Sequence, residues 1–143
     1  MGNVTSVMTA NPACCTQDSP LQDVARKMLD NDCGQIPVVD ADNRPVGVVT
    51  DRDIAIRVVA KGTDHASATA KDAMSTPCKT IKHDMALKDA VNLMETEKIR
   101  RVSVVDGDGK LVGIVSVADL ATNDKKEATA EVVSSVSQAP AQR

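Results

Sequence analysis

Two short stretches of the chain place a hydroxyl three residues before a carboxylate, where a predicted strand gives way to a predicted helix. They are GVVTDRDI at residues 47–54, with Thr50 and Asp53, and GIVSVADL at residues 113–120, with Ser116 and Asp119. A carboxylate can accept two hydrogen bonds from a diol, and N–H groups at a helix start favour an anion. The pair therefore suits a ribose and a phosphate. It equally suits a capping box, in which each side chain binds the other's backbone N–H.

The two stretches belong to an internal duplication. A shift of 66 residues aligns 18–54 with 84–120, and twelve of the 37 pairs are identical, where chance would give two or three. Upstream the match continues from Met8 to Met74. The glycine before each hydroxyl, Gly47 or Gly113, leaves room for a close approach to the backbone. The sequence predicts one unit over 7–61, a linker over 62–72, a second unit over 73–121 and a mobile tail over 122–143.

The hydrophobic spacing changes in the same order within each unit. Apolar residues first recur at helical spacing, at Leu21, Val24, Ala25, Met28 and Leu29 and at Leu87, Ala90, Val91 and Met94. Two short β-branched segments follow, IPVVD with PVGVVT and VSVVD with KLVGIVS, joined by turn residues. Each unit is therefore predicted to contain an extended start, a helix, two strands and a second helix.

The ends of two helices are predicted from single residues. Ser19 is expected to cap the helix that starts near Pro20, and Gln22 stands where a capping box prefers Glu or Gln. The next helix is expected to run from Thr50 or Asp51 to Lys61 and to end at Gly62, with a shorter equivalent over 117–121.

Composition excludes several classes of function. The chain has 143 residues, a formal charge of −3 and no aromatic residue, so it lacks both the cations that replace phosphate counterions and the rings that stack on bases. Nucleic acid is not expected as a partner. No apolar run approaches the roughly 18 residues of a membrane helix, and the N-terminus lacks signal-peptide features. Membrane association is therefore not expected, and the expected location is the cytoplasm.

The sequence shows neither the residue spacing of a metal site nor a set of catalytic residues. Cys14, Cys15, Cys33 and Cys78 include no C-x-x-C pair and are expected to remain thiols, with a disulfide between Cys33 and Cys14 or Cys15 as the alternative. DGDGK at 106–110 is expected to be a hairpin turn rather than a calcium loop. His65 and His83 are expected to be exposed, no metal site is predicted, and no nucleophile, base and oxyanion set assembles, so the chain is not predicted to be an enzyme.

Both units resemble cystathionine beta-synthase domains, or CBS domains, over most of residues 7–121. The helix stripe ending in Met28 or Met94, the strands IPVVD and VSVVD, and the two hydroxyl-carboxylate endings produce this resemblance. The run TDRDIAIRVVAKG is also similar to small stand-alone bacterial CBS pairs of the hypoxic response type. The resemblance implies an α+β fold of two β-α-β-β-α units, related by a pseudo-twofold and packed through their sheets. It also implies two clefts for adenosine-containing ligands and association into homodimers.

The resemblance also implies which residues would contact a ligand. One cleft would use Ser116 and Asp119 for the ribose and Arg100 and Arg101 for phosphate, with Thr16 and the backbone of Cys33, Gly34, Gln35 and Ile36 near the base. The other would use Thr50 and Asp53, with Arg52 in place of the missing arginine pair, together with Thr80 and the backbone from Ile99 to Val102. We expect the cleft with Arg100 and Arg101 to dominate.

The predicted function is regulatory. The chain is expected to bind an adenine nucleotide or S-adenosylmethionine, to require no cofactor and to signal to an unidentified protein partner by a conformational change. Without aromatic residues, the adenine would lie between aliphatic side chains such as those of Ile36 and Val102. The alternative is a constitutive interaction or assembly protein that responds to no nucleotide.

Overall fold

The structure, a computed structural model, describes residues 2–121. The described residues separate into two compact units, one formed by residues 13–78 and the other by residues 2–12 together with residues 79–121. We call them the first-repeat unit and the second-repeat unit. These boundaries lie at 12/13 and 78/79, whereas the sequence alone predicts units that are each continuous along the chain.

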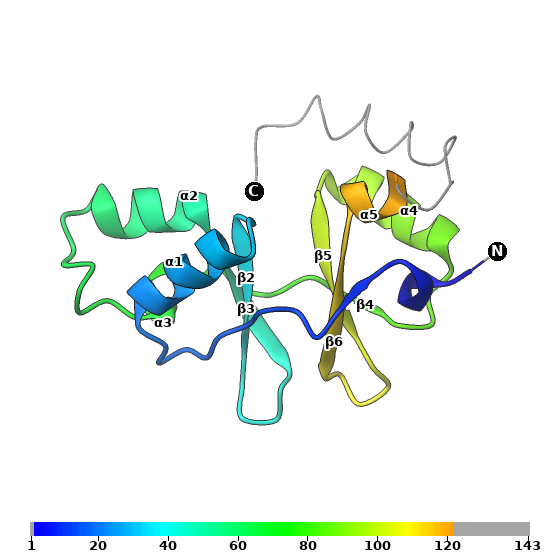
Figure 1. Cartoon of the computed structure of the whole chain (residues 1–143), viewed down its shortest axis with the longest axis horizontal. Helices are drawn as coiled ribbons and strands as arrows, with labels where there is room; N and C mark the ends of the chain where they lie inside the picture. Colours follow the sequence, from blue (N-terminus) through cyan, green and yellow to red (C-terminus); the bar gives the residue numbers. More distant parts are fainter. Residues whose placement is uncertain (1, 122–143) are drawn as a thin grey trace. The chain divides into compact units, whose positions relative to one another are not determined.

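The first-repeat unit packs two strands against helices (Figure 1). Its elements are α1 (Leu21–Asp30), β2 (Gln35–Val39), β3 (Pro45–Thr50), α2 (Asp51–Asp53), η2 (Ile54–Val59) and α3 (Ala70–Ala73). Strands β2 and β3 form an antiparallel hairpin. Single bridges extend the hairpin on both sides, from Cys15 to Val38 and from Ser75 to Val48.

The second-repeat unit has the same order with longer flanking strands. Its elements are η1 (Val4–Ser6), β1 (Thr9–Ala10), β4 (Thr80–Lys82), α4 (Leu87–Glu97), β5 (Arg101–Val105), β6 (Leu111–Ser116) and α5 (Val117–Ala121). The sheet order is β1-β6-β5-β4, with β4 and β5 parallel and the other pairs antiparallel. Mixed helices and strands in both units confirm the predicted α+β fold.

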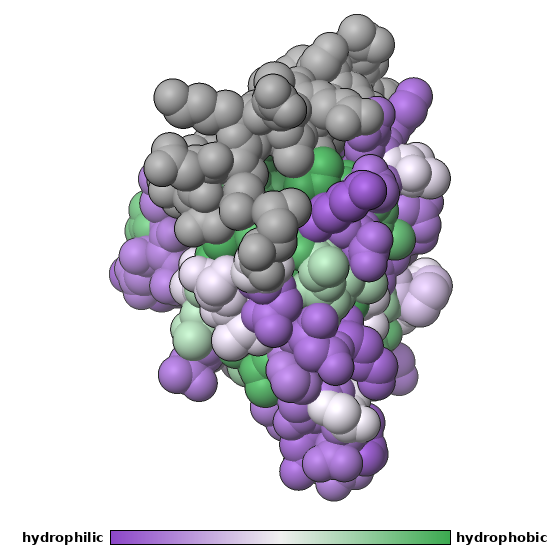
Figure 2. Space-filling view, turned by 90° about the vertical axis from the view of Figure 1, so that its right-hand side faces the viewer, coloured by the Kyte–Doolittle hydropathy of each residue, from purple (hydrophilic) through white to green (hydrophobic). Residues whose placement is uncertain are grey.

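Each unit has its own apolar core, built from the strands and most of the predicted helix stripe, although Ala25 and Leu29 of that stripe are exposed. In the first, Leu21, Val24 and Met28 of α1 pack with strand residues such as Val38 and Val49. In the second, the corresponding α4 stripe packs with residues such as Val104 and Val115. Hydrophilic residues gather toward the lower end of the unit facing the viewer in Figure 2, where the β5–β6 turn lies.

The segment before each repeat packs on the other repeat. In Figure 1 the N-terminal segment runs alongside the strands of the second-repeat unit, where Thr9 pairs with Ile114 of β6. Ser75, 66 residues after Thr9, exchanges two backbone hydrogen bonds with Val48 of β3, at 2.8 and 3.0 Å. The duplicated sequence therefore builds two similar sheets from exchanged edge segments, a long-range arrangement that local periodicity does not reveal.

Two predicted helix details differ in the structure. Ser19 does not cap α1: its Oγ accepts a hydrogen bond from the Thr16 N–H at 3.0 Å, and Pro20 occupies the cap position. The helix expected over 50–61 is present, but residues Ile54–Val59 are wound as a π-helix. Gly62 follows with a φ of 72°, a left-handed conformation that glycine adopts without steric cost.

Candidate functional site

The two hydroxyl-carboxylate pairs form reciprocal capping boxes. Thr50 donates its backbone N–H to Asp53 Oδ2 at 3.0 Å, and Asp53 returns its own to Thr50 Oγ1 at 3.0 Å. In the second repeat, the Ser116 N–H binds Asp119 Oδ2 at 2.8 Å and the Asp119 N–H binds Ser116 Oγ at 3.1 Å. The capping interpretation is therefore correct for both copies. A carboxylate offers about four acceptor positions, so a capping box is compatible with further hydrogen bonds to the same carboxylate.

Strand pairing brings the arginines of the second repeat to this junction. Arg101 lies directly opposite Ser116 across the β5–β6 ladder, and residues opposite one another project to the same face of a sheet. The Arg100 carbonyl accepts the Val117 N–H at 3.0 Å, which fixes the start of β5 against the start of α5. Arg100, Arg101, Ser116 and Asp119 therefore lie together within one unit.

The first repeat has the same backbone frame with different side chains. Gln35 lies opposite Thr50, and the Gly34 carbonyl accepts the Asp51 N–H at 2.9 Å. Asp51 stands where the second repeat has Val117, and its Oδ1 accepts the Arg52 N–H at 2.8 Å. Its carboxylate places a further negative charge at a junction that lacks the arginine pair, which opposes phosphate binding there.

Asp53 is also bound to other parts of its own unit. Ser75 Oγ lies 3.2 Å from Asp53 Oδ1 and 3.4 Å from Oδ2, and Arg57 Nε lies 3.6 Å from Oδ1. Asp53 is only 7% exposed. Its carboxylate therefore holds the exchanged segment around Ser75 on the first-repeat sheet, a role that the hydroxyl-carboxylate spacing does not predict.

The remaining candidate residues divide between the units. Thr16 is exposed and contacts Ser19 Oγ at 3.3 Å through its hydroxyl. Cys33 donates its thiol to the Gln35 carbonyl at 3.6 Å. Thr80 begins β4, is exposed and pairs with Ser103.

The two aliphatic side chains expected near adenine belong to the apolar cores. Ile36 and Val102 are each 1% exposed, and their side chains belong to the helix-facing cores of their own units. Alternate residues of a strand point to opposite faces, and these two point toward the helices of their own units.

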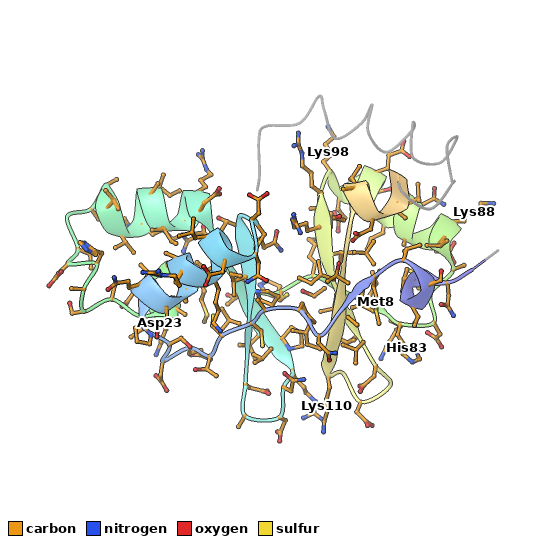
Figure 3. All side chains as sticks on the ribbon, viewed as in Figure 1. Met8, Asp23, His83, Lys88, Lys98 and Lys110 are labelled. Atoms are coloured by element: carbon orange, nitrogen blue, oxygen red, sulfur yellow. The ribbon has the colours of Figure 1, made fainter. Side chains whose placement is uncertain are left out.

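The two equivalent glycines, Gly47 and Gly113, leave room for the exchanged segments. A Cβ at Gly47 would lie 2.9 Å from the Ser75 carbonyl oxygen and 3.1 Å from Met74 Sδ. A Cβ at Gly113 would lie 2.9 Å from Met8 Cγ and 3.0 Å from the Thr9 carbonyl oxygen; Figure 3 labels Met8 beside this strand. The close approach inferred from sequence is thus made by the protein's own backbone.

The sites set aside in the sequence have structural roles. Asp106 accepts N–H groups from Asp108 and Lys110 at 2.9 and 3.0 Å, which forms the hairpin turn. The Lys110 bond, followed by that of Asp108, holds the pKa of Asp106 below its usual value. His65 is exposed and His83 is half-buried. Within residues 2–121, no cluster of three or more His, Cys, Asp or Glu could hold a metal ion.

The cysteines are free thiols rather than a disulfide. Cys15 lies in the first-repeat core, and burial, followed by the neighbouring Cys14, raises its pKa to about 11. Among the described helices, none is long and apolar enough to cross a membrane.

Two sheet-and-helix units with paired capping junctions define a tandem repeat of CBS type. The CBS domain model matches residues 4–60 and 70–125, and the chain belongs to this family. The chain is 37% identical over 130 residues to the CBS domain-containing protein YhcV of Bacillus subtilis, covering 91% of each chain. It is 31% identical over 136 residues to Hypoxic response protein 1 of Mycobacterium tuberculosis, covering 95% of this chain and 94% of that protein.

A further relative is longer. Over 98 residues, 68% of this chain, the sequence is 39% identical to the uncharacterized protein MK0525 of Methanopyrus kandleri, and the match spans 50% of that protein. The resemblance to stand-alone CBS pairs is thus confirmed by chains of similar length, while this relative carries additional sequence.

Solved structures share the fold. Hypoxic Response Protein I, with two coordinated zinc ions, superposes with a TM-score of 0.76 at 32% identity, covering 85% of this chain and 98% of that one. CBSX2 in complex with AMP gives 0.75 at 24% identity, covering 89% and 98%. The CBS domain pair of MJ0100, with 5-methylthioadenosine and S-adenosyl-L-methionine, gives 0.75 at 21%, covering 89% and 98%.

Proposed function

We propose that this chain is a non-catalytic regulatory protein that binds an adenosine-containing ligand at the β6–α5 junction of its second repeat. The observation that supports this most directly is the pairing of Arg101 with Ser116. This pairing puts two guanidinium-bearing residues beside a hydroxyl and a carboxylate.

Each residue has a role suited to its chemistry. The Asp119 carboxylate accepts hydrogen bonds from the ribose diol while Oδ2 keeps its capping bond to the Ser116 N–H. The Ser116 Oγ accepts the Asp119 N–H, and its hydroxyl proton can be donated to the ligand. Arg100 and Arg101 bind phosphate through their planar forks of donors.

The relatives support an adenosine ligand. CBSX2 is found with AMP, and the MJ0100 pair with 5-methylthioadenosine and S-adenosyl-L-methionine. What these ligands have in common is an adenosine, so their presence on one shared fold favours a ligand of that class here. Nothing in the proposal requires a resident cofactor, and we assign the chain no reaction.

We further propose that the protein acts as a homodimer in the cytoplasm and signals by a ligand-dependent change of conformation. Leu29 of α1 and Ile56 and Val59 of η2 expose 73%, 43% and 65% of their surface, and we assign them to the proposed association surface of the first-repeat unit. A ligand shifts a conformational equilibrium only by its difference in affinity for the two states.

Thermal unfolding with a panel of adenosine ligands tests the proposal. A ligand at a hundred times its dissociation constant stabilises the folded state by about 2.7 kcal/mol, a shift of several degrees for a domain of this size. We expect one or more of AMP, ADP, ATP and S-adenosylmethionine to produce this shift. Asp119→Ala should remove the shift. Asp53→Ala should keep the shift, although its melting temperature without ligand should be lower.

Two outcomes would contradict the proposal in different ways. Loss of the shift in Asp53→Ala and not in Asp119→Ala would move the site to the first repeat. No shift with any of the ligands on well-folded protein would favour the alternative, a constitutive assembly protein, and the search would turn to protein partners.

A further inference from the structure

Three cations fall within four residues at the start of β5. Arg101 is half-buried opposite Ser116, while Lys98 and Arg100 are exposed. Figure 3 places Lys98 at the end of the unit where β5 begins, away from Lys88 on α4 and from Lys110 at the hairpin turn. Positive charge is therefore concentrated at the end of the sheet where Ser116 and Asp119 also lie.

The turn that presents Lys98 has a counterpart of opposite charge. Asp32 occupies the equivalent position in the first repeat, and both residues are left-handed, with φ of 49° and 55°. The following residues close the turns alike: the Cys33 N–H binds the Met28 carbonyl at 3.0 Å, and the Ile99 N–H binds the Met94 carbonyl at 3.1 Å. The backbone is thus the same while the charge is reversed.

The charge difference covers the whole junction. Residues 98–101 and 116–119 of the second repeat, KIRR and SVAD, have a formal charge of +2. The equivalent residues 32–35 and 50–53 of the first repeat, DCGQ and TDRD, have a formal charge of −2. One guanidinium can bind a phosphate through two parallel hydrogen bonds, so a third cation beside two arginines favours a ligand with more than one phosphate.

We infer that the second-repeat site prefers a nucleoside diphosphate or triphosphate over AMP and S-adenosylmethionine, and that Lys98 is a specificity-determining residue. This inference rests on the proposed adenosine site. Each added phosphate charge near a cation is worth about fivefold in affinity, from the Coulomb energy of unit charges 4 Å apart in water. The sulfonium of S-adenosylmethionine carries a positive charge, which the same cations repel.

Isothermal titration with adenosine, AMP, ADP, ATP, tripolyphosphate and S-adenosylmethionine tests this order in wild type, Lys98→Asp and Lys88→Asp. EDTA is included so that the phosphates keep their full charge. Lys98→Asp introduces the residue that the equivalent left-handed turn already accepts in the first repeat. Lys88→Asp makes the same change of charge at an exposed position on α4. We expect ATP to bind at least about tenfold tighter than AMP in wild type and Lys88→Asp, and Lys98→Asp to lose most of that difference.

The outcomes separate the inference from the proposed function. If AMP or S-adenosylmethionine binds and ATP binds no tighter, the preference for polyphosphates is overturned while the adenosine site stands. If Lys98→Asp and Lys88→Asp reduce the preference equally, the specificity role of Lys98 is overturned. If tripolyphosphate alone binds as tightly as ATP, the nucleoside part is overturned. If no adenosine compound binds, the proposed function itself fails.

Discussion

Asp53 and Asp119 occupy equivalent places in the two repeats, yet their surroundings differ. Both accept the backbone N–H of the hydroxyl residue three positions earlier. Asp53 also binds Ser75 and Arg57 and is buried, while Asp119 is half-buried in a junction flanked by Arg100 and Arg101. The comparison shows that a duplicated motif can keep its backbone hydrogen bonds while one copy becomes part of the internal structure.

A few residue differences between the repeats set the charge at each junction. Asp51 and Val117 stand at one pair of equivalent positions, and Gly34 and Arg100 at another. Neither substitution disturbs the backbone, because in both repeats the N–H at the start of the helix binds the carbonyl at the start of the opposite strand. The electrostatic character of a junction therefore changes independently of its frame.

The largest expected effect on stability comes from filling the space beside the glycines. In Gly47→Ala the new Cβ would lie 2.9 Å from the Ser75 carbonyl oxygen, and a backbone atom on a paired segment moves only if the pairing moves. We expect a loss of about 1–3 kcal/mol in the free energy of unfolding, measured by urea denaturation. Gly107→Ala is the control: a Cβ at Gly107 would have no heavy atom within 4 Å, so the loss should be smaller. Equal losses would break this part of the comparison.

The next effect concerns the hydroxyl that binds Asp53. Ser75→Ala removes a hydrogen bond to a buried carboxylate and should lower the free energy of unfolding by about 1 kcal/mol. Thr9→Ala changes the equivalent residue, which is exposed, and should change stability by no more than about 0.5 kcal/mol. Chemical denaturation of the two variants checks this difference, and a Thr9 effect as large as that of Ser75 would contradict it.

A third effect, limited to alkaline pH, involves the first-repeat core. The pKa of Cys15 is raised by burial from 9.0 to about 11, so the folded state holds the thiol proton more tightly than the unfolded chain does. The resulting stabilisation is fully present below pH 9 and is lost as the pH rises toward 11. Thermal unfolding of wild type and Cys15→Ala across this range should converge. Parallel curves would show that Cys15 makes no such contribution.

The smallest effect is expected at the β5–β6 turn. The Lys110 and Asp108 N–H groups lower the pKa of Asp106 below 3.8. Its contribution to stability is therefore present above pH 3.8 and is lost as the pH falls through the folded-state pKa. NMR titration of the Asp106 carboxyl group should show the lowered pKa. A midpoint at the ordinary value would contradict the assignment of these hydrogen bonds.

Much of this arrangement could be predicted from sequence because it is local. The stripe from Leu21 to Met28 predicted α1, and the spacing of Ser116 and Asp119 predicted a capping box as one of two interpretations. DGDGK predicted a turn in which Asp106 binds nearby N–H groups. In each case the residues that interact lie within a few positions of one another, so their spacing reflects their contact.

Other features depend on contacts between distant residues. Ser75 reaches Asp53 across 22 positions of the sequence, and the Thr5 hydroxyl binds the carbonyl of His83, 78 positions away. The sequence predicts Ile36 and Val102 near an adenine, and only strand pairing and helix packing show that their side chains face the cores. No local pattern distinguishes a strand residue on one face from its neighbour when both faces are apolar.

By itself, the sequence determined the duplication, the family, the order of helices and strands in each repeat, and the concentration of positive charge near Arg100. These follow from identities at a fixed offset and from the periodicity of hydrophobic residues, both of which can be read directly from the sequence. The tertiary structure decided that each leading segment pairs with the sheet of the other repeat and that Asp53 binds Ser75. The physical reason is that an edge strand is selected by the hydrogen-bonding groups it satisfies, wherever in the chain they lie.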